Sequence, residues 1–124
     1  MKKTVMICDD EADLLTLFAS ALSSKYNVLT AESGRSCLSK YQDEKGKGNA
    51  IDVLLLDYRL GDMLGDYVAC KIREFDGTKT IIISAYDLEK TFINDLIQKN
   101  CIMGMLKKPI SIRGLFEKLE ELTE

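Results

Sequence analysis

The sequence predicts an α/β protein in which a five-stranded parallel sheet carries helices on both of its faces. Two observations support this class. Short apolar runs of strand length alternate five times with segments whose apolar residues recur at helical spacing. The runs are apolar throughout, which is typical of strands that are covered on both sides, as in a parallel sheet. Right-handed connections between such strands then place helices on both faces.

The expected strands and helices follow one another without interruption. The five strand-like runs are residues 4–8, 26–31, 51–56, 80–85 and 101–106. A helical pattern follows each run, and Ser33 and Ser111 stand where two of these helices would begin, because a serine side chain can cap a first turn. We expect polar loops at 43–49 and 58–65. Since no linker separates the repeats, the sequence predicts one domain over residues 1–124.

The composition narrows the classes of function. The formal charge is −3 and no long run of lysine or arginine occurs, so direct binding of nucleic acid is not expected. No apolar stretch approaches about 18 residues and no signal segment is present, so we expect no membrane span and a cytoplasmic location. The four cysteines lack a CxxC spacing and histidine is absent, which excludes the usual zinc sites and Ser-His or Cys-His catalytic pairs. Disulfides are not expected.

Polar side chains follow the apolar runs at the carboxyl edge, which is where ligands bind in such sheets. They are Asp9 and Asp10 after the first run, Asp57 after the third, Ser84 near the end of the fourth and Lys108 after the fifth. Each alone has an ordinary structural explanation: Asp10 could cap the first helix, for example, and Asp57 could form a turn. A suitable polar residue at four separate junctions is less easily explained by chance. We therefore expect these side chains to form one site.

The charges of this group predict its chemistry. Two carboxylates about 4 Å apart repel each other by roughly 4 kcal/mol at an effective dielectric constant of about 20. A domain whose stability is about 5–15 kcal/mol would not hold three of them together without a cation. Oxygen ligands without histidine or cysteine favour Mg²⁺, which binds carboxylates beside a phosphate. Because Lys108 adds a second positive charge, the residues predict a phosphoryl-transfer site with bound Mg²⁺.

These residues resemble the site of the receiver domains of two-component response regulators, and the resemblance extends over essentially the whole chain. The motifs that carry it are ICDD with Asp9 and Asp10, LLLDYRLGD with Asp57, IIISAY with Ser84, and LKKP with Lys108. The resemblance implies a flavodoxin-like, doubly wound (βα)5 fold with the strand order 2-1-3-4-5. It also implies a signalling switch with only autophosphorylation and autodephosphorylation activity, and not an enzyme in the usual sense.

The resemblance assigns a role to each acidic residue. Asp57 would accept a phosphoryl group from the phosphohistidine of a sensor histidine kinase or a histidine phosphotransfer protein. Asp10, Asp57 and the backbone carbonyl of Arg59 would ligate Mg²⁺. Asp9 would act mainly through water.

The resemblance also implies roles at the fourth and fifth strands. Lys108 would pair with Asp57 and then with the phosphoryl oxygens, while Lys107 would have no part in the site. The bond between Lys108 and Pro109 would be cis, as in the family. Ser84 would hydrogen-bond to the phosphoryl group and begin the switch.

Two positions depart from the family pattern. Met105 stands where an aromatic residue usually acts as a rotamer switch, so we expect Ser84 to move and Met105 to give a less discrete signal. Gly61 stands where a proline is common, so the loop after Asp57 is expected to be more mobile. The signal would reach the face formed by the fourth helix, the fifth strand and the fifth helix, which would meet a downstream effector or a second copy of the chain. The mixed charges of that face do not choose between these partners.

Arg59 and Tyr86 lie two residues beyond Asp57 and Ser84. In the receiver arrangement they would flank the path of a water that attacks the acyl phosphate. Their bulk predicts slower autodephosphorylation than small residues would give.

Three other functions agree less well with the residues. A pseudo-receiver, a protein-binding module of the same fold that is never phosphorylated, usually lacks an acidic residue or the lysine of the site, and this chain retains them. A phosphatase of the haloacid-dehalogenase kind needs an aspartate two residues after its nucleophile, where this chain has Arg59. A flavin-binding protein needs a phosphate-binding Ser/Thr-Gly loop after the first strand, where Asp9, Asp10 and Glu11 would repel phosphate. The pseudo-receiver is the main alternative.

Overall fold

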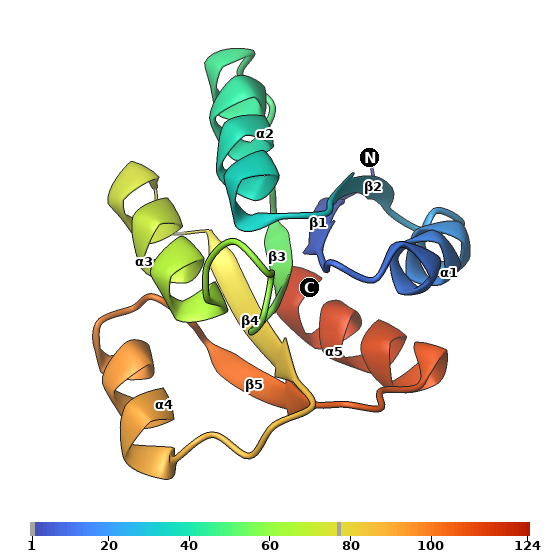
Figure 1. Ribbon diagram of the computed structural model, residues 1–124. Coiled ribbons are helices and arrows are strands. Elements are labelled where there is room, and N and C mark those ends of the chain that lie inside the picture. Colours follow the sequence, from blue (N-terminus) through green and yellow to red (C-terminus); the bar gives the residue numbers. More distant parts are fainter. Residues whose placement is uncertain (1, 77) are drawn as a thin grey trace.

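The computed structural model describes residues 2–76 and 78–124, in which strands and helices alternate from β1 to α5 (Figure 1). The strands are β1 (Thr4–Cys8), β2 (Asn27–Ala31), β3 (Val53–Asp57), β4 (Lys79–Ser84) and β5 (Gly104–Lys107). The helices are α1 (Ala12–Leu22), α2 (Gly34–Gly46), α3 (Gly65–Phe75), α4 (Lys90–Gln98) and α5 (Ile112–Thr123). The predicted order of strands and helices is confirmed. Within the described ranges, no helix is both long and apolar enough to cross a membrane.

The strands pair in parallel, and their order across the sheet is β2-β1-β3-β4-β5. The order reverses between β1 and β3, because the chain runs outward from β1 to β2 and then returns to the other side of β1. This confirms the flavodoxin-like, doubly wound class, in which ligands bind at the carboxyl edge beside the reversal. The peptide bond between Lys108 and Pro109 is cis, as expected.

Helices cover both faces of the sheet (Figure 1), with α1 and α5 on one side and α2, α3 and α4 on the other. Alternate residues of β3 point into the two cores. Val53 and Leu55 pack with α1 and α5, whereas Leu54 and Leu56 pack with α2, α3 and α4. All four side chains are fully buried. This strand is apolar at successive positions because neither of its faces meets water.

The end of α2 differs from the prediction. The helix continues to Gly46 and so includes part of the stretch 43–49 that was predicted to be a loop. Lys45 donates a hydrogen bond to the carbonyl oxygen of Phe75 at 2.6 Å, which ties the last turn of α2 to the end of α3. A contact of this kind depends on the tertiary structure and is not visible in local polarity.

The start of β5 also differs, because residues 101–103 precede the strand instead of belonging to it. Cys101 donates its N–H to the carbonyl oxygen of Leu96 at 3.0 Å and so belongs to the turn that ends α4. This turn is buried, and apolar character alone does not separate a buried turn from a strand. The other strands lie within two residues of their predicted bounds.

The predicted helix caps are partly confirmed. Ser33 and Ser111 each accept a hydrogen bond from the N–H three residues later, at 3.0 and 2.9 Å, at the starts of α2 and α5. The explanation of Asp10 as a cap of α1 is wrong, because Glu11 occupies the capping position and no side chain caps that helix. Asp10 therefore does not cap α1.

A glycine is required where α3 approaches the end of β3. The N–H of Gly65 donates to the carbonyl oxygen of Tyr58 at 2.6 Å. A Cβ at position 65 would lie 2.7 Å from the backbone oxygen of Asp57. Any side chain there would therefore move the backbone of Asp57, whereas a Cβ at Gly46 would meet no neighbouring atom.

We predict that Gly65→Ala lowers the free energy of unfolding by about 1–3 kcal/mol, because the added methyl group forces a backbone shift in a packed region. Gly46→Ala is the matched control, and it should leave the free energy unchanged or raise it by up to about 1 kcal/mol, since alanine is the better helix former. Urea unfolding followed by circular dichroism measures both. Equal stabilities of the two variants would contradict the close approach.

Candidate functional site

The carboxyl edge of the sheet brings the predicted acidic side chains together. Asp9 and Asp10 follow β1, and Asp57 is the last residue of the neighbouring β3. One carboxylate oxygen from each residue lies within 4.8 Å of the other two. Asp9 and Asp57 are buried and Asp10 is exposed. Three carboxylates thus share a small volume, and two of them have little contact with water.

Lys108, which follows β5, supplies positive charge to this acidic cluster. Its Nζ lies 3.1 Å from Oδ2 of Asp9 and 3.5 Å from Oδ1 of Asp57, and its side chain is only 15% exposed. Oε1 of Glu11 is a further neighbour at 3.7 Å. The sequence analysis gave Glu11 no role beside the lysine, although its place directly after the acidic pair was an available signal. The carboxylates outnumber the ammonium group, so the cluster keeps an excess of negative charge.

Burial and crowding change the acidity of the site. Loss of water is the main cause that raises the pKa of Asp57 from 3.8 to about 6, with Asp9 and Asp10 raising it further and Lys108 opposing them. Burial lowers the pKa of Lys108, but the hydrogen bond to Asp9 and the charge of Asp57 outweigh it, so that pKa is raised. In the protein without a metal, ionising Asp57 therefore costs more free energy than ionising an ordinary aspartate.

The donor set fits Mg²⁺. Three carboxylates converge, and the exposed side chain of Asp10 leaves part of the site open to water. Mg²⁺ binds through carboxylate oxygens, retains several waters and dehydrates reluctantly, so a partly open oxygen site suits it. A divalent cation would also offset the excess negative charge that raises the pKa of Asp57.

The two predicted switch residues lie on β4 and β5. Ser84 is fully buried at the end of β4, and its Oγ accepts a hydrogen bond from the N–H of Tyr86 at 2.9 Å. The hydroxyl is thus engaged within the loop that follows β4. Met105 pairs with Ile82 in the sheet and packs, half-buried, against the core that contains Leu96 of α4.

Arg59 and Tyr86 contact each other. The guanidinium group of Arg59 lies 4.3 Å from the centre of the Tyr86 ring, and Tyr86 is 50% exposed. A cation over an aromatic face is attractive, by about 0.5–1 kcal/mol at exposed positions. The contact joins the loops that follow β3 and β4, which carry Asp57 and Ser84.

Two contacts near the site were not predicted. Tyr58, the residue after Asp57, packs edge-on against Phe92 of α4 with the ring centres 6.2 Å apart. Lys107 forms an ion pair with Asp87. Neither pair has a sequence signal, because each joins residues from different loops or helices.

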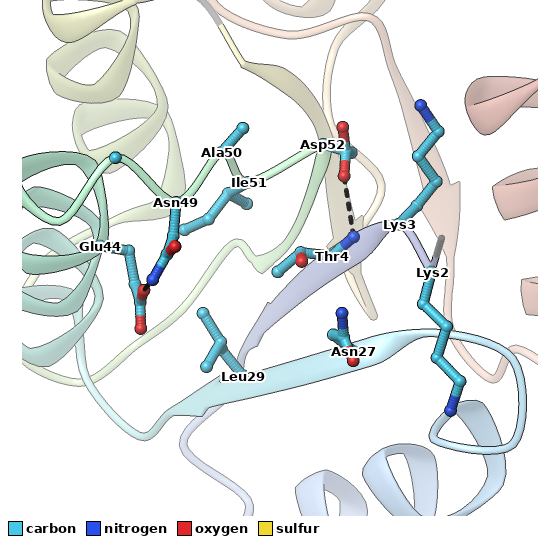
Figure 2. A pocket seen from close by; sticks show the side chains of 11 residues that line it. Lys2, Lys3, Thr4, Asn27, Leu29, Glu44, Asn49, Ala50, Ile51 and Asp52 are labelled. Atoms are coloured by element: carbon cyan, nitrogen blue, oxygen red, sulfur yellow. Dashed lines mark hydrogen bonds between the residues drawn. The ribbon is translucent and has the colours of Figure 1, made fainter.

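A separate hollow of about 610 Å³ lies at the opposite, amino edge of the sheet (Figure 2). Two hydrogen bonds join polar groups of its lining. The N–H of Thr4 donates to Asp52 at 2.8 Å, and the amide of Asn49 donates to Glu44 at 2.7 Å. The acidic cluster, which gathers three carboxylates and a lysine, is the better candidate for a functional site.

Fold and site together define a class of protein: a doubly wound α/β domain with an acidic cluster and a lysine at the carboxyl edge of its sheet. The family model of the response regulator receiver domain matches residues 5–120. The chain therefore belongs to the response regulator receiver domain family, as the resemblance indicated. Receiver domains act in two-component signal transduction as switches and not as enzymes in the usual sense.

Known relatives agree with this family. The transcriptional regulatory protein KdpE of Staphylococcus aureus is 31% identical over 116 residues, which are 93% of this chain and 47% of KdpE. The transcriptional regulatory protein GlrR of Escherichia coli K12 is 27% identical over 124 residues, which are 97% of this chain and 26% of GlrR. The chain thus spans less than half of the length of these curated relatives.

Solved structures show the same fold. A CheY-like receiver domain protein from Methanospirillum hungatei is 24% identical, with a TM-score of 0.84 over 98% of this chain and 93% of that one. The response regulator protein TrrA from Thermotoga maritima, solved in complex with Mg²⁺-BeF, is 26% identical. Its TM-score is 0.77 over 97% of this chain and 98% of that one.

We predict that Asp57→Asn stabilises the metal-free protein. The pKa of Asp57 is raised to about 6 in the folded protein, so the folded state binds this proton more tightly than the unfolded state, whose pKa is near 3.8. The loss of stability that comes from ionising Asp57 is absent below pH 3.8 and complete above about pH 6. At neutral pH in EDTA, the variant should be more stable than wild type by about 1–3 kcal/mol, and the difference should shrink towards pH 4.

Urea unfolding at several pH values measures this difference. Asp43→Asn removes an exposed carboxylate of α2 and is the matched control, with an expected change within about 0.5 kcal/mol. Excess Mg²⁺ should stabilise wild type more than Asp57→Asn, because a ligand of the folded state adds its binding free energy. A variant no more stable than wild type at neutral pH would show that Asp57 carries no such penalty.

Proposed function

We propose that residues 1–124 form one phospho-accepting receiver domain and that Asp57 takes a phosphoryl group from a phosphohistidine, with Mg²⁺ bound beside it. The observation that carries the proposal is the position of Asp57. Its carboxylate lies within 4.8 Å of those of Asp9 and Asp10 and 3.5 Å from Nζ of Lys108. Phosphoryl transfer depends mainly on positioning and on neutralising charge, and this cluster offers a nucleophile, a fixed cation and ligands for a second cation.

The chain's own residues divide the work of transfer. A carboxylate oxygen of Asp57 forms the bond to phosphorus while the phosphorus–nitrogen bond of the donor breaks and the imidazole leaves with the electron pair. Lys108 lies within reach of Asp57 and can shift its contact to a phosphoryl oxygen, which offsets charge at that oxygen. The same residues would serve the proposed autophosphorylation by a small phosphodonor and the proposed autodephosphorylation by water.

The proposed ligands of Mg²⁺ are Asp10, Asp57 and the backbone carbonyl of Arg59, with Asp9 acting mainly through water. Bound Mg²⁺ would supply positive charge beside the phosphoryl oxygens. The oxygen donors and the raised pKa of Asp57 support a divalent cation here. The complex of the Thermotoga relative with Mg²⁺-BeF adds support, since beryllofluoride imitates a phosphoryl group.

Ser84 and Met105 are the proposed switch. The Ser84 hydroxyl donates to the carbonyl oxygen of Tyr86 at 3.2 Å, and it must give up this bond to donate to a phosphoryl oxygen. Moving a two-state equilibrium from about 1:99 to 99:1 needs roughly 5.5 kcal/mol. Two charge-assisted hydrogen bonds of about 1.5–3 kcal/mol each would supply most of this. Because Met105 is flexible, the response of α4, β5 and α5 would be less discrete than with an aromatic residue.

The proposed partners follow from this chemistry. A sensor histidine kinase or a histidine phosphotransfer protein would donate the phosphoryl group, and the α4-β5-α5 face would contact a downstream effector or a second copy of the chain. The curated relatives are transcriptional regulatory proteins of which this chain matches one part, which supports an effector region outside the receiver domain. A cytoplasmic location and the absence of direct binding to nucleic acid belong to the same proposal.

Incubation with acetyl phosphate, with and without Mg²⁺, tests the proposal by intact mass. Wild type should gain one phosphoryl group only when Mg²⁺ is present, because the crowded carboxylates otherwise repel the donor. Asp57→Asn should gain none. Asp43→Asn, which leaves the site intact, should react as wild type does.

A pseudo-receiver gives the opposite result in this experiment. Its mass would stay unchanged with both acetyl phosphate and a phosphorylated histidine kinase, in the presence of Mg²⁺. An adduct that persists in Asp57→Asn would equally reject Asp57 as the acceptor.

Arg59 and Tyr86 contact each other, and we predict that together they slow autodephosphorylation by hindering the water that attacks the acyl phosphate. The double variant Arg59→Ala, Tyr86→Ala should lose its phosphoryl group about twofold to fivefold faster, which corresponds to loss of a contact of about 0.5–1 kcal/mol. Tyr67→Ala removes another half-exposed tyrosine, on α3, and should decay at the wild-type rate. Decay of the phosphoprotein is followed by intact mass. A double variant that decays no faster than wild type would reject this role.

A further inference from the structure

The loop that follows β3, residues 58–64, has a defined shape; we call it the phosphorylation loop. Arg59 and Leu64 form an antiparallel bridge across its base. Gly61, at its tip, has φ +84°. Proline cannot adopt this conformation, since its ring holds φ at about −65°. The loop therefore turns in a way that a proline at this position would not allow.

This turn brings Asp62 to the start of α2. Its Oδ1 accepts a hydrogen bond from the N–H of Gly34 at 2.8 Å, and its Oδ2 accepts one from the N–H of Arg35 at 2.9 Å. The first N–H groups of a helix have no partner within the helix, and negative charge is favourable there. These two bonds lower the pKa of Asp62. Asp62 thus caps α2 from another loop, beside the local cap by Ser33.

The neighbouring residue adds an apolar contact. A Cβ at Gly34 would lie 2.2 Å from Cγ of Met63, so the Met63 side chain rests on the bare backbone of α2. Met63 also packs, half-buried, against the core beneath α2 and α3. We call the contacts of Asp62 and Met63 with α2 the latch.

The latch lies at the far end of a short segment whose other end is the site. Asp57 directly precedes the phosphorylation loop, and Arg59, whose carbonyl is a proposed ligand, lies within it. A Cβ at Gly61 would lie 4.0 Å from Oδ2 of Asp10, so the tip of the loop borders the acidic cluster. A loop that is ordered in advance loses less conformational entropy when a metal binds. Loss of the latch would therefore disturb the part of the proposed metal site that the phosphorylation loop supplies, which is the carbonyl of Arg59.

We propose that Asp62 is a positioning residue of the phosphorylation site: its hydrogen bonds to α2 hold the phosphorylation loop in the shape that completes the Mg²⁺ site. The inference rests on the proposed function for the identity of the metal. Asp62 acts through the loop and does not touch the metal or the phosphoryl group. Its carboxylate already accepts hydrogen bonds from two backbone N–H groups of α2.

The chain offers a matched control for this proposal. Ser33→Ala removes a cap of the same helix without touching the phosphorylation loop, whereas Asp62→Ala removes the cap and frees the loop. Both should lower the melting temperature by a similar amount, about 3–6 °C. Only Asp62→Ala should raise the dissociation constant for Mg²⁺, by about threefold to tenfold, in a titration followed by the NMR shifts of backbone amides. Asp62→Asn should restore part of the affinity, because its amide oxygen still accepts one hydrogen bond.

Hydrogen exchange of the metal-free proteins provides a second measurement. The N–H of Leu60 donates to the carbonyl oxygen of Met63 at 3.3 Å inside the loop. It should exchange faster in Asp62→Ala than in Ser33→Ala, by about tenfold if the latch orders the loop. A merely structural role in α2 would speed exchange equally in both variants.

Three results would overturn the proposal. They are an Mg²⁺ affinity of Asp62→Ala within twofold of wild type, an equal loss of affinity in Ser33→Ala, and unchanged exchange of Leu60 in Asp62→Ala. If wild type itself binds no Mg²⁺, the proposed function fails at its metal, and the comparison of exchange rates alone then decides whether the latch orders the loop.

Discussion

The crowding of Asp9, Asp10 and Asp57 around Lys108 is the constraint on which the rest of the structure depends. The pairing of Cys8 with Leu56 in adjacent parallel strands brings the residues that follow them side by side. The sheet thus forces like charges together at one edge. It can do so because β1 and β3 are buried along almost their whole length, and their packing in two cores outweighs the repulsion at their ends.

The residues of the site follow strands from the centre of the sheet to its edge at β5. The charge of the site is therefore close to the side of the molecule that carries α4 and β5. The acidic residues come from the central strands, whereas Lys108 follows the edge strand β5 and Ser84 ends the strand between them. A change of charge at Asp57 therefore acts on Asp9 and Asp10 after β1 and on Lys108 after β5. Tyr58 extends this connection to α4 through its edge-on contact with Phe92. An aromatic contact with α4 thus starts beside Asp57, although position 105 on β5 is a methionine and not an aromatic residue.

The parts of the site that the sequence predicted are those that depend on strand order. Apolar runs reveal the strands, and a parallel sheet places their ends at one edge, so Asp9 could be grouped with Asp57 and Lys108 without coordinates. The contacts of Glu11 with Lys108 and of Asp62 with α2 depend on the path of loops and on side-chain directions. Such contacts result from tertiary packing and produce no periodic pattern in the sequence. The buried turn before β5 was misassigned for the same reason, because burial produces apolar residues in turns as well as in strands.

The positions of the basic residues help to explain why the acidic cluster keeps its excess negative charge in a chain with 17 basic and 20 acidic residues. In this fold the helices run antiparallel to the strands, so their carboxyl ends, which carry partial negative charge, lie at the amino edge of the sheet. Three lysines donate there to carbonyl oxygens at or beside helix ends. They are Lys2 to Ser23 at 3.1 Å, Lys45 to Phe75 at 2.6 Å and Lys79 to Leu122 at 2.7 Å.

At the carboxyl edge, by contrast, Lys107 is paired with Asp87, and among the described residues Lys108 alone forms ion pairs with the acidic cluster. The helix starts at this edge add only about half a positive charge each, and their effect fades within one turn. Positive charge is thus bound where the helices end, far from the carboxylates. The same chain direction that gathers the carboxylates also places the helix ends that bind these three lysines at the opposite edge, so the acidic cluster remains open to a cation from solution.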